Sequence, residues 1–119
     1  MEQNSKLFND MGFIMVSRKL SRLTTLEAAI VYGELLLNRM ENLEAGETFE
    51  IDGKIFFTVL QEEIAAETAL TIRQVSQAID KLIEIGALEK KHIGVPTLNY
   101  YHIVPDRMLE FYDMKGGDL

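Results

Sequence analysis

Residues 58–86, TVLQEEIAAETALTIRQVSQAIDKLIEIG, and the residues 87–104 that follow, ALEKKHIGVPTLNYYHIV, decide the fold of this chain. In the second half of the first stretch, apolar residues recur at i, i+3, i+4, i+7 and i+8: Val75, Ala78, Ile79, Leu82 and Ile83. This spacing predicts an amphipathic helix with one continuous apolar stripe. Thr71 and Gln74 have the spacing of a capping box at its start, and Gly86 is suited to end it in the left-handed conformation.

A shorter helix is expected just before this one. Thr58 and Gln61 match a second capping box, which predicts a helix over about 59–67. The apolar face of this helix comprises Leu60, Ile64 and Ala65. Residues 68–70 then join the two helices, and a connection of this length is typical of a helix-turn-helix.

Two β-rich runs follow, at 88–93 and 98–103, around a turn that contains glycine and proline, and they predict a hairpin. Helix, turn, helix and hairpin is the order of elements in a winged-helix domain. The sequence therefore predicts an α+β fold, with a single winged helix-turn-helix domain over residues 1–119. Within it, we expect the helix-turn-helix at 58–86 and the hairpin wing at 87–104.

The remaining elements are predicted from local signals. Asp52 and Gly53 between two β-rich runs predict an extra hairpin with a two-residue type I′ turn. Thr24 and Glu27 match a capping box that opens a long helix, the first of three core helices, and Gly46 is suited to end it. This helix is apolar around more than half of its circumference, through Leu26, Ile30, Val31, Leu35, Leu37 and Met40.

Ahead of the long helix, residues 12–16 form a short β-rich run, and a basic patch follows at Arg18, Lys19 and Arg22. The simpler interpretation of this patch is a solvated loop. The alternative is an additional phosphate contact beside the helix-turn-helix. The sequence leaves both interpretations open.

A short C-terminal helix is predicted at 106–114, after Pro105 and with Asp106 as its cap. It carries four large apolar or aromatic residues: Met108, Leu109, Phe111 and Tyr112. One small domain has too little interior to bury both this helix and the whole apolar surface of the long helix. We therefore expect these two elements to pair two chains in a homodimer.

The composition is that of an ordinary globular protein, with 47% hydrophobic and 26% charged residues in 119. The chain has no cysteine, which excludes disulfides and thiolate chemistry. No apolar run approaches the roughly 18 to 20 residues of a membrane span, and residues 13–16 are too few for the core of a signal peptide. We expect a soluble, cytoplasmic protein with no membrane contact.

The net charge of −7 argues against indiscriminate nucleic-acid binding, because phosphate contacts need local positive charge. The charge is unevenly distributed, however. Residues 39–67 hold two basic and eight acidic side chains, whereas residues 71–92 hold four basic and three acidic ones. The acidity therefore lies away from the second helix of the helix-turn-helix and the wing.

No pattern in the sequence predicts an enzyme, a metal site or a cofactor. The chain lacks a glycine-rich phosphate loop, an H-E-x-x-H motif and a nucleophile elbow. His92 and His102 lie on the two strands of the predicted wing and could face each other. Two histidines without a third ligand do not define a metal site, so solvated wing residues are the simpler interpretation.

The aromatic residues and the polar face of the second helix have structural and functional interpretations. Phe49, Phe56 and Phe57 are expected in the core. Tyr100 and Tyr101 are neighbours on a strand and must point to opposite faces, one buried and one exposed to a partner. Arg73, Gln77 and Lys81 share a helix face at i, i+4 and i+8, flanked by Gln74 and Ser76. Such a face can read guanine and adenine in the major groove, and its alternative is a generic solvated surface.

The order of several motifs resembles winged-helix proteins of plasmids, phages and integrative elements of Gram-positive bacteria. The motifs are TTLEAA at 24–29, FFT at 56–58, LIEIGALEK at 82–90, GVP at 94–96 and YY at 100–101. Two groups that the chain resembles are the N-terminal domains of plasmid replication initiator A proteins and of DnaD-like phage replisome organisers. The resemblance covers residues 13–104.

The resemblance implies a recognition helix in the major groove and a wing on the flanking backbone or minor groove. The implied DNA-binding positions are Thr71, Arg73, Gln74, Ser76, Gln77 and Lys81 on the helix, with Lys90, Lys91, His92 and Tyr100 on the wing. The chain departs from its relatives at Asn99, where they carry a basic residue. Replication initiators continue into a further domain, so we expect an accessory DNA binder rather than a complete initiator.

Together these features predict a sequence-specific binder of double-stranded DNA from a mobile genetic element. It would act in replication initiation, transfer or transcriptional control, with a replication or transfer protein as a further partner. The alternative is an acidic winged-helix module for protein–protein interaction that does not bind DNA. The sequence predicts no enzymatic activity in either case.

Overall fold

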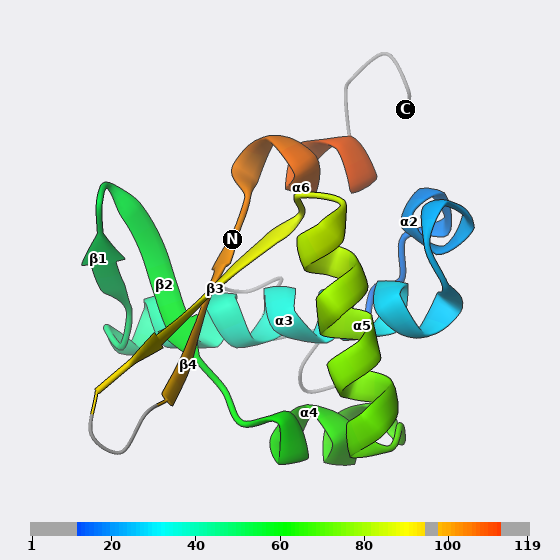
Figure 1. The fold of residues 1–119 in the computed structure, drawn as a ribbon, viewed down its shortest axis with the longest axis horizontal. Coiled ribbons are helices and arrows are strands. Elements are labelled where there is room, and N and C mark those ends of the chain that lie inside the picture. The colour runs from blue at the N-terminus through cyan, green and yellow to red at the C-terminus, as the bar shows by residue number, and fades with distance from the viewer. Residues whose placement is uncertain (1–11, 95–97, 113–119) are drawn as a thin grey trace.

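Helices and antiparallel strands alternate along the part of the chain that this computed structural model describes, residues 12–94 and 98–112 (Figure 1). The helices are α2 (Arg18–Leu23), α3 (Leu26–Ala45), α4 (Gln61–Thr68), α5 (Ile72–Glu84) and α6 (Pro105–Phe111). The strands are β1 (Phe49–Ile51), β2 (Lys54–Thr58), β3 (Leu88–Ile93) and β4 (Leu98–Ile103). The α+β class expected from the sequence is confirmed.

The four strands form one antiparallel sheet in the order β1-β2-β4-β3. It consists of two hairpins. In the first, Asp52 and Gly53 have positive φ angles of 53° and 76°, as the predicted type I′ turn requires. The β3–β4 ribbon has the predicted strand ends, and its turn residues 95–97 lie outside the described part. The hairpins are joined where Phe57 pairs with Tyr101 and Thr58 with Tyr100.

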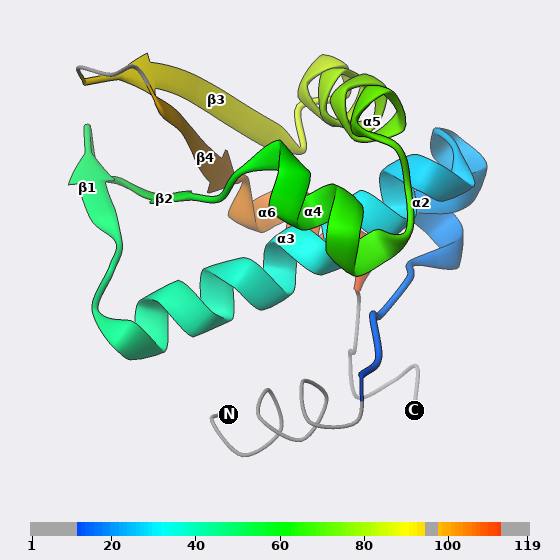
Figure 2. The same ribbon diagram turned by 90° about the horizontal axis from the view of Figure 1, so that it is seen from below.

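α5 forms as its sequence predicts. Thr71 and Gln74 complete the capping box, with the Thr71 hydroxyl accepting from the Gln74 amide at 3.0 Å and the Gln74 side chain accepting from the Thr71 amide at 2.9 Å. Gly86, at φ 77°, follows the helix in the left-handed conformation. The buried stripe on this helix is Val75, Ala78, Ile79 and Leu82. Figure 2 shows α3 running across the molecule, with α5 and the two hairpins on one side of it.

The start of α4 differs from the prediction. Thr58 does not cap this helix, because it is the last residue of β2 and its hydroxyl donates to the carbonyl oxygen of Asn99 at 2.9 Å. The helix begins at Gln61, after Leu60, whose amide donates to the Glu63 carboxylate at 3.1 Å. Leu60 is exposed rather than part of the apolar face, while Ile64 is fully buried. Pairing with the sheet thus outweighs the local capping signal.

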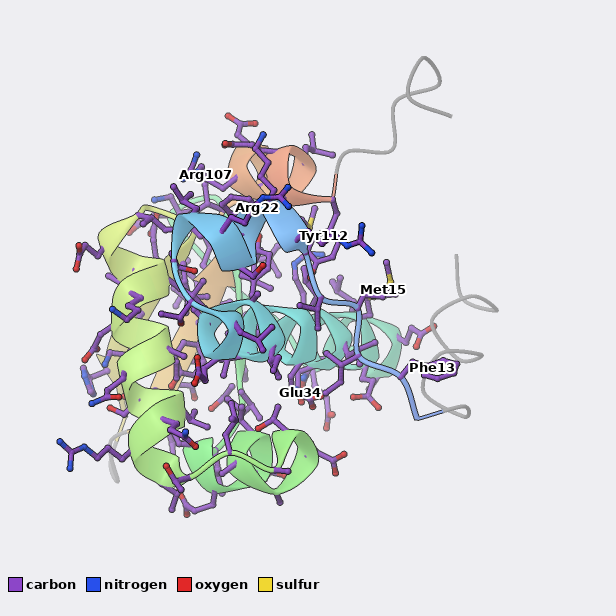
Figure 3. All side chains as sticks on the ribbon, turned by 90° about the vertical axis from the view of Figure 1, so that its right-hand side faces the viewer. Phe13, Met15, Arg22, Glu34, Arg107 and Tyr112 are labelled. Atoms are coloured by element: carbon purple, nitrogen blue, oxygen red, sulfur yellow. The ribbon has the colours of Figure 1, made fainter. Side chains whose placement is uncertain are left out.

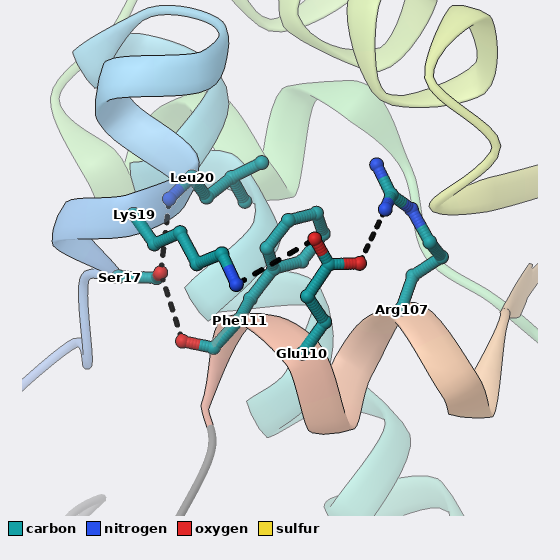
Figure 4. A network of polar contacts seen from close by, with 6 residues as sticks. All are labelled: Ser17, Lys19, Leu20, Arg107, Glu110 and Phe111. Carbon is teal, nitrogen blue, oxygen red and sulfur yellow. Dashed lines mark hydrogen bonds and ion pairs between the residues drawn. The ribbon is translucent and has the colours of Figure 1, made fainter.

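The segment before α3 also differs from the prediction. Residues 12–16 form no strand, and Arg18, Lys19 and Arg22 lie on the helix α2 rather than in a solvated loop. Ser17 explains this helix, because its hydroxyl accepts from the Leu20 amide at 3.1 Å and donates to the Phe111 carbonyl at 2.9 Å (Figure 4). The second of these bonds joins residues 94 apart in sequence, so no local pattern reveals it.

α3 begins one residue later than predicted. Thr25, not Thr24, is its cap and accepts from the Ala28 amide at 3.1 Å, while the Thr24 hydroxyl donates to the carbonyl of Leu20. Gly46 ends the helix as predicted, at φ 71°. Leu26, expected on the apolar face, is 58% exposed. Val31 and Leu35 are buried as predicted, and the other buried residues of α3 are Ala28, Ala29, Tyr32, Gly33 and Glu34.

α6 is shorter than the predicted helix at 106–114. It begins with Pro105, after Val104 rather than with Asp106 as the cap, and the part of the prediction at 113–114 lies outside the described residues. Phe111 is buried against Tyr32, with the two rings edge-on and their centroids 5.6 Å apart. This contact packs α6 on α3.

The outer face of the sheet holds a small aromatic cluster that the sequence did not predict correctly. Phe56 is buried there as expected, but Phe49 is 47% exposed. His102, expected to be solvated, is buried beside Phe56, and its Nδ1 lies 2.9 Å from the carbonyl oxygen of Ile55. Because the ladder between β2 and β4 is formed only at residues 57 and 58 of β2, this imidazole bridges the strands where that ladder ends.

Candidate nucleic-acid interface

The exposed face of α5 carries the side chains that could read a DNA groove. Arg73, Gln77 and Lys81 are exposed, and Ser76 is half-buried. The capping box and the buried stripe on the opposite side fix the helix, so these side chains project from a rigid support. Asp80 and Glu84 are exposed on the same helix and reduce its positive charge.

Two of the predicted contact residues already serve the helix itself. Thr71 is exposed, but its hydroxyl and amide both bond to Gln74. Gln74 is half-buried, with its side-chain oxygen engaged at the cap. Only the Gln74 side-chain NH₂ group remains for a ligand. We infer that these two residues position Arg73 and Gln77 more than they contact a partner.

The wing distributes its predicted contact residues over both of its faces. Lys90 and His92 share the strand face of Leu88, which packs in the core together with the buried residues of α5. Lys90 is half-buried and His92 is exposed. Towards the tip of the wing, this face therefore points to the same side as α5.

Lys91 and Tyr100 lie on the other face of the wing, directly opposite each other in the strand register. The ammonium of Lys91 is 5.9 Å from the ring centroid of Phe56, and Tyr100 meets Phe49 edge-on with centroids 5.2 Å apart. Both residues are half-buried against the first hairpin. The structure therefore does not bring them together with the exposed face of α5. Of the predicted tyrosine pair, Tyr101 is the buried member.

The histidines of the wing do not face each other. In the register of the ribbon, His92 pairs with Asn99 and His102 pairs with Glu89. Asn99, which sequence reasoning did not include as a contact, thus joins Lys90 and His92 on one face; alternation along the strand was the signal for it. The described residues contain no group of three or more histidine or acidic side chains placed to hold a metal ion.

A second surface, far more acidic, lies between α3 and α4. A groove of about 490 Å³ there is lined by the four carboxylates of Glu34, Glu41, Glu63 and Glu67. Figure 3 shows Glu34 on the side of α3 that faces α4. Burial, reinforced by the charge of Glu67, raises the pKa of Glu34 to about 7. The acidity of the chain is thus concentrated away from the exposed face of α5.

Within the described ranges 12–94 and 98–112, none of the helices has the length and apolar character needed to cross a membrane.

Comparison with solved structures finds chains with a similar fold. One similar structure is the N-terminal domain of a DNA-binding protein, with a TM-score of 0.62 and 16% identity over 87% of this chain and 88% of the other. A second comes from a Rep–DNA complex, with a TM-score of 0.61 and 16% identity over 87% of this chain and 89% of the other. No protein-family model matches the sequence, and no curated protein does.

These likenesses show that the chain shares its fold with both structures over nearly its whole length. At 16% identity they carry no residue-level information about this chain. The function must therefore be argued from the side chains described above.

Proposed function

We propose that this protein is a winged-helix protein that binds double-stranded DNA at a specific sequence, with α5 as its recognition helix. The observation that carries the proposal is the solvent face of Arg73, Gln77 and Lys81 on a capped helix whose opposite stripe is buried. A B-DNA major groove admits such a helix, in which arginine pairs with guanine and glutamine with adenine. The two structural relatives, one a DNA-binding protein domain and one from a Rep–DNA complex, support this proposal.

In this arrangement the wing holds the DNA backbone beside the groove. Lys90, His92 and Asn99 lie on the face of the ribbon that points to the side of α5. A lysine at that position neutralises a phosphate, whereas an asparagine or histidine donates a hydrogen bond to a phosphate oxygen. These contacts fix the register of the protein on DNA without reading sequence.

The wider setting follows from the resemblance in sequence. We place the protein in the cytoplasm, as a homodimer that serves the replication, transfer or transcription of a mobile genetic element, together with a replication or transfer protein. A symmetric dimer would read two half-sites, as helix-turn-helix proteins commonly do. The proposal assigns no catalytic step and no cofactor to the chain.

The second candidate is a protein–protein interaction module, which the acidic groove and the net charge of −7 favour. The four glutamates that line the groove form no ion pair with a described lysine or arginine. A basic partner protein would therefore find there the negative charge of Glu41, Glu63 and Glu67, which no described lysine or arginine neutralises. The first candidate function requires the exposed face of α5 to bind DNA, whereas the second does not.

The experiment that separates them is selection of bound sequences from a random pool of duplexes. A specific DNA binder enriches one motif, and the enriched duplex then binds more tightly than a scrambled one. Failure to enrich a motif, with no duplex binding at about 50 mM salt, where phosphate contacts are strong, would reject DNA binding in favour of the interaction module.

A further inference from the structure

The helices α2 and α6 carry a cluster of positive charge that the proposed recognition helix and wing do not use. Its members are Arg18, Lys19 and Arg22 on α2 and Arg107 on α6; we call them the flank cluster. The described charges of these two helices sum to +2, because Asp106 and Glu110 offset two of the four cations. In a chain of net charge −7, such a surplus needs an explanation.

Internal contacts account for only part of this charge. Glu110 pairs with Arg107 and lies 3.6 Å from the ammonium of Lys19 (Figure 4). Arg107 is further held over the ring of Phe111, 5.0 Å from its centroid. By contrast, Arg18 and Arg22 are exposed and form no ion pair with any other described residue. These two guanidinium groups are thus free to meet an external anion.

The flank cluster lies next to the recognition helix, on the side opposite the wing. Figures 1 and 2 both show α5 between the β3–β4 ribbon and α2. Thr25, three residues after Arg22, lines a groove together with Glu27 of α3 and Gln77 and Lys81 of α5. Figure 3 shows Arg22 on the part of α2 near α6 and Arg107. This groove, whose lining includes the carboxylate of Glu27, separates Lys81 from the cations of α2, so the flank cluster is a second positive patch beside α5.

The dimensions suit a duplex that reaches both flanks. The longest axis of the molecule is 47 Å, which corresponds to roughly 14 base pairs at about 3.4 Å each. A duplex with α5 in its major groove would extend past the helix on both sides. On one side it meets Lys90 of the wing, and on the other it meets Arg18 and Arg22.

We propose that the flank cluster is a second phosphate-binding surface, which holds the DNA backbone on the side of α5 opposite the wing. This inference rests on the proposed function. The ligand is the phosphate backbone, because exposed arginines on a short surface helix offer charge and donors but no fixed geometry for reading bases. Arg18 and Arg22 make these contacts, whereas Lys19 and Arg107 are committed to Glu110.

The test compares duplexes of different length, each carrying one half-site of the selected motif. One ends at the base pairs that α5 covers, and the others extend it by about eight base pairs on one side or the other. For R18Q/R22Q, we expect wild-type affinity on the short duplex and on one extended duplex. On the other extended duplex, the slope of log affinity against log salt should fall by roughly 1.8, at about 0.9 per phosphate.

A matched control removes two positive charges elsewhere. K54Q/K91Q takes both charges from the outer face of the sheet, which points away from α5, so it should leave the salt slope unchanged on every duplex. Equal losses by R18Q/R22Q on all duplexes, or no loss on any, would overturn the second surface while leaving the recognition helix intact. Absence of duplex binding by the wild-type protein would overturn the proposed function as well.

Discussion

Gly33 of α3 lies directly against the backbone of Met15, so that a Cβ atom at Gly33 would stand 2.2 Å from the Met15 carbonyl oxygen. The same oxygen accepts a hydrogen bond of 2.7 Å from the hydroxyl of Tyr112. The segment before α2 is thereby held between the middle of α3 and the residue that follows α6. A side chain at Gly33 would push this segment away, because the obstructing atom belongs to the backbone.

Gly33→Ala should therefore destabilise the protein, by about 1 to 3 kcal/mol, as overpacking of a tight contact does. A loss of stability would be informative, because replacing glycine with alanine within a helix ordinarily raises the free energy of unfolding by about 1 kcal/mol. Urea unfolding measures the difference. Tyr112→Phe is the companion variant: it keeps the ring stacked on Tyr32 and should cost about 1 kcal/mol for the lost hydroxyl. A Gly33→Ala variant more stable than wild type would contradict the close approach.

Glu34 makes stability depend on pH in an unusual direction. Burial raises the pKa of this carboxyl to about 7, so the folded state holds its proton over a range in which the unfolded chain has lost it. Between about pH 4.5 and pH 7 the folded state binds more protons than the unfolded state. The free energy of unfolding therefore falls as the pH rises from about 4.5 to about 7.

Glu34→Gln should remove this pH dependence. Glutamine keeps an oxygen that can accept from the Asn38 amide, 3.1 Å away in the wild type, but carries no charge to desolvate. We expect the variant to be more stable than wild type at pH 8, by up to about 3 kcal/mol, and nearly equal at pH 5. Urea unfolding at both pH values measures this. Glu67→Gln, which removes only the neighbouring charge, should give a smaller change in the same direction.

The parts of the fold that the sequence predicted are those fixed by contacts between near neighbours. The caps of α5 lie three residues apart, and the turn at Asp52 and Gly53 needs only its own two residues. The buried stripe of α5 repeats at helical period, so the sequence identifies it without reference to the elements that it packs against. For the candidate site, the same periodicity placed Arg73, Gln77 and Lys81 on the exposed side.

The parts that the sequence did not predict depend on residues far apart in the chain. α2 forms around Ser17, whose partner is the Phe111 carbonyl. Thr58 has a capping pattern, but its hydroxyl instead donates a hydrogen bond to the carbonyl oxygen of Asn99 on β4. On the wing, the resemblance implies DNA contacts for both Lys90 and Lys91, although strand alternation sends these neighbours to opposite faces. Burial of Lys91 on Phe56 depends on the first hairpin, which no local pattern places there.

The proposed homodimer has a testable surface. Leu109 is 65% exposed and Met15 is 46% exposed, beside an apolar groove of about 360 Å³ that includes Met40 and Met108. If two copies meet there, Leu109→Glu should yield a monomer at tens of micromolar in sedimentation, because it would bury an unpaired charge. Leu26→Glu is the matched control: this leucine is 58% exposed but lies outside the groove. A wild-type monomer would reject the dimer outright.

The recognition helix can be tested residue by residue on the selected duplex. Arg73→Ala and Gln77→Ala should each weaken binding to that duplex by roughly 1 to 3 kcal/mol, with little change on scrambled DNA and in stability. Thr71→Ala should act differently, costing about 1 kcal/mol of stability through the lost cap. Fluorescence anisotropy and urea unfolding measure the two effects. Equal losses on selected and scrambled DNA would mean that Arg73 and Gln77 contact only phosphate.

The wing provides the sharpest contrast, because two adjacent lysines should behave differently. Lys90 lies on the face that points to the side of α5, whereas Lys91 lies on the opposite face with its ammonium over the ring of Phe56. Lys90→Ala should therefore flatten the slope of log affinity against log salt by about 0.9 for each bound chain, the contribution of one phosphate. Lys91→Ala should leave the slope unchanged, and its effect should appear in urea unfolding, since the side chain covers Phe56. Titrations of the selected duplex from about 50 to 200 mM salt measure the slopes. A larger change with Lys91→Ala than with Lys90→Ala would mean that DNA approaches the other face of the ribbon, in which case α5 could not lie in the adjoining major groove.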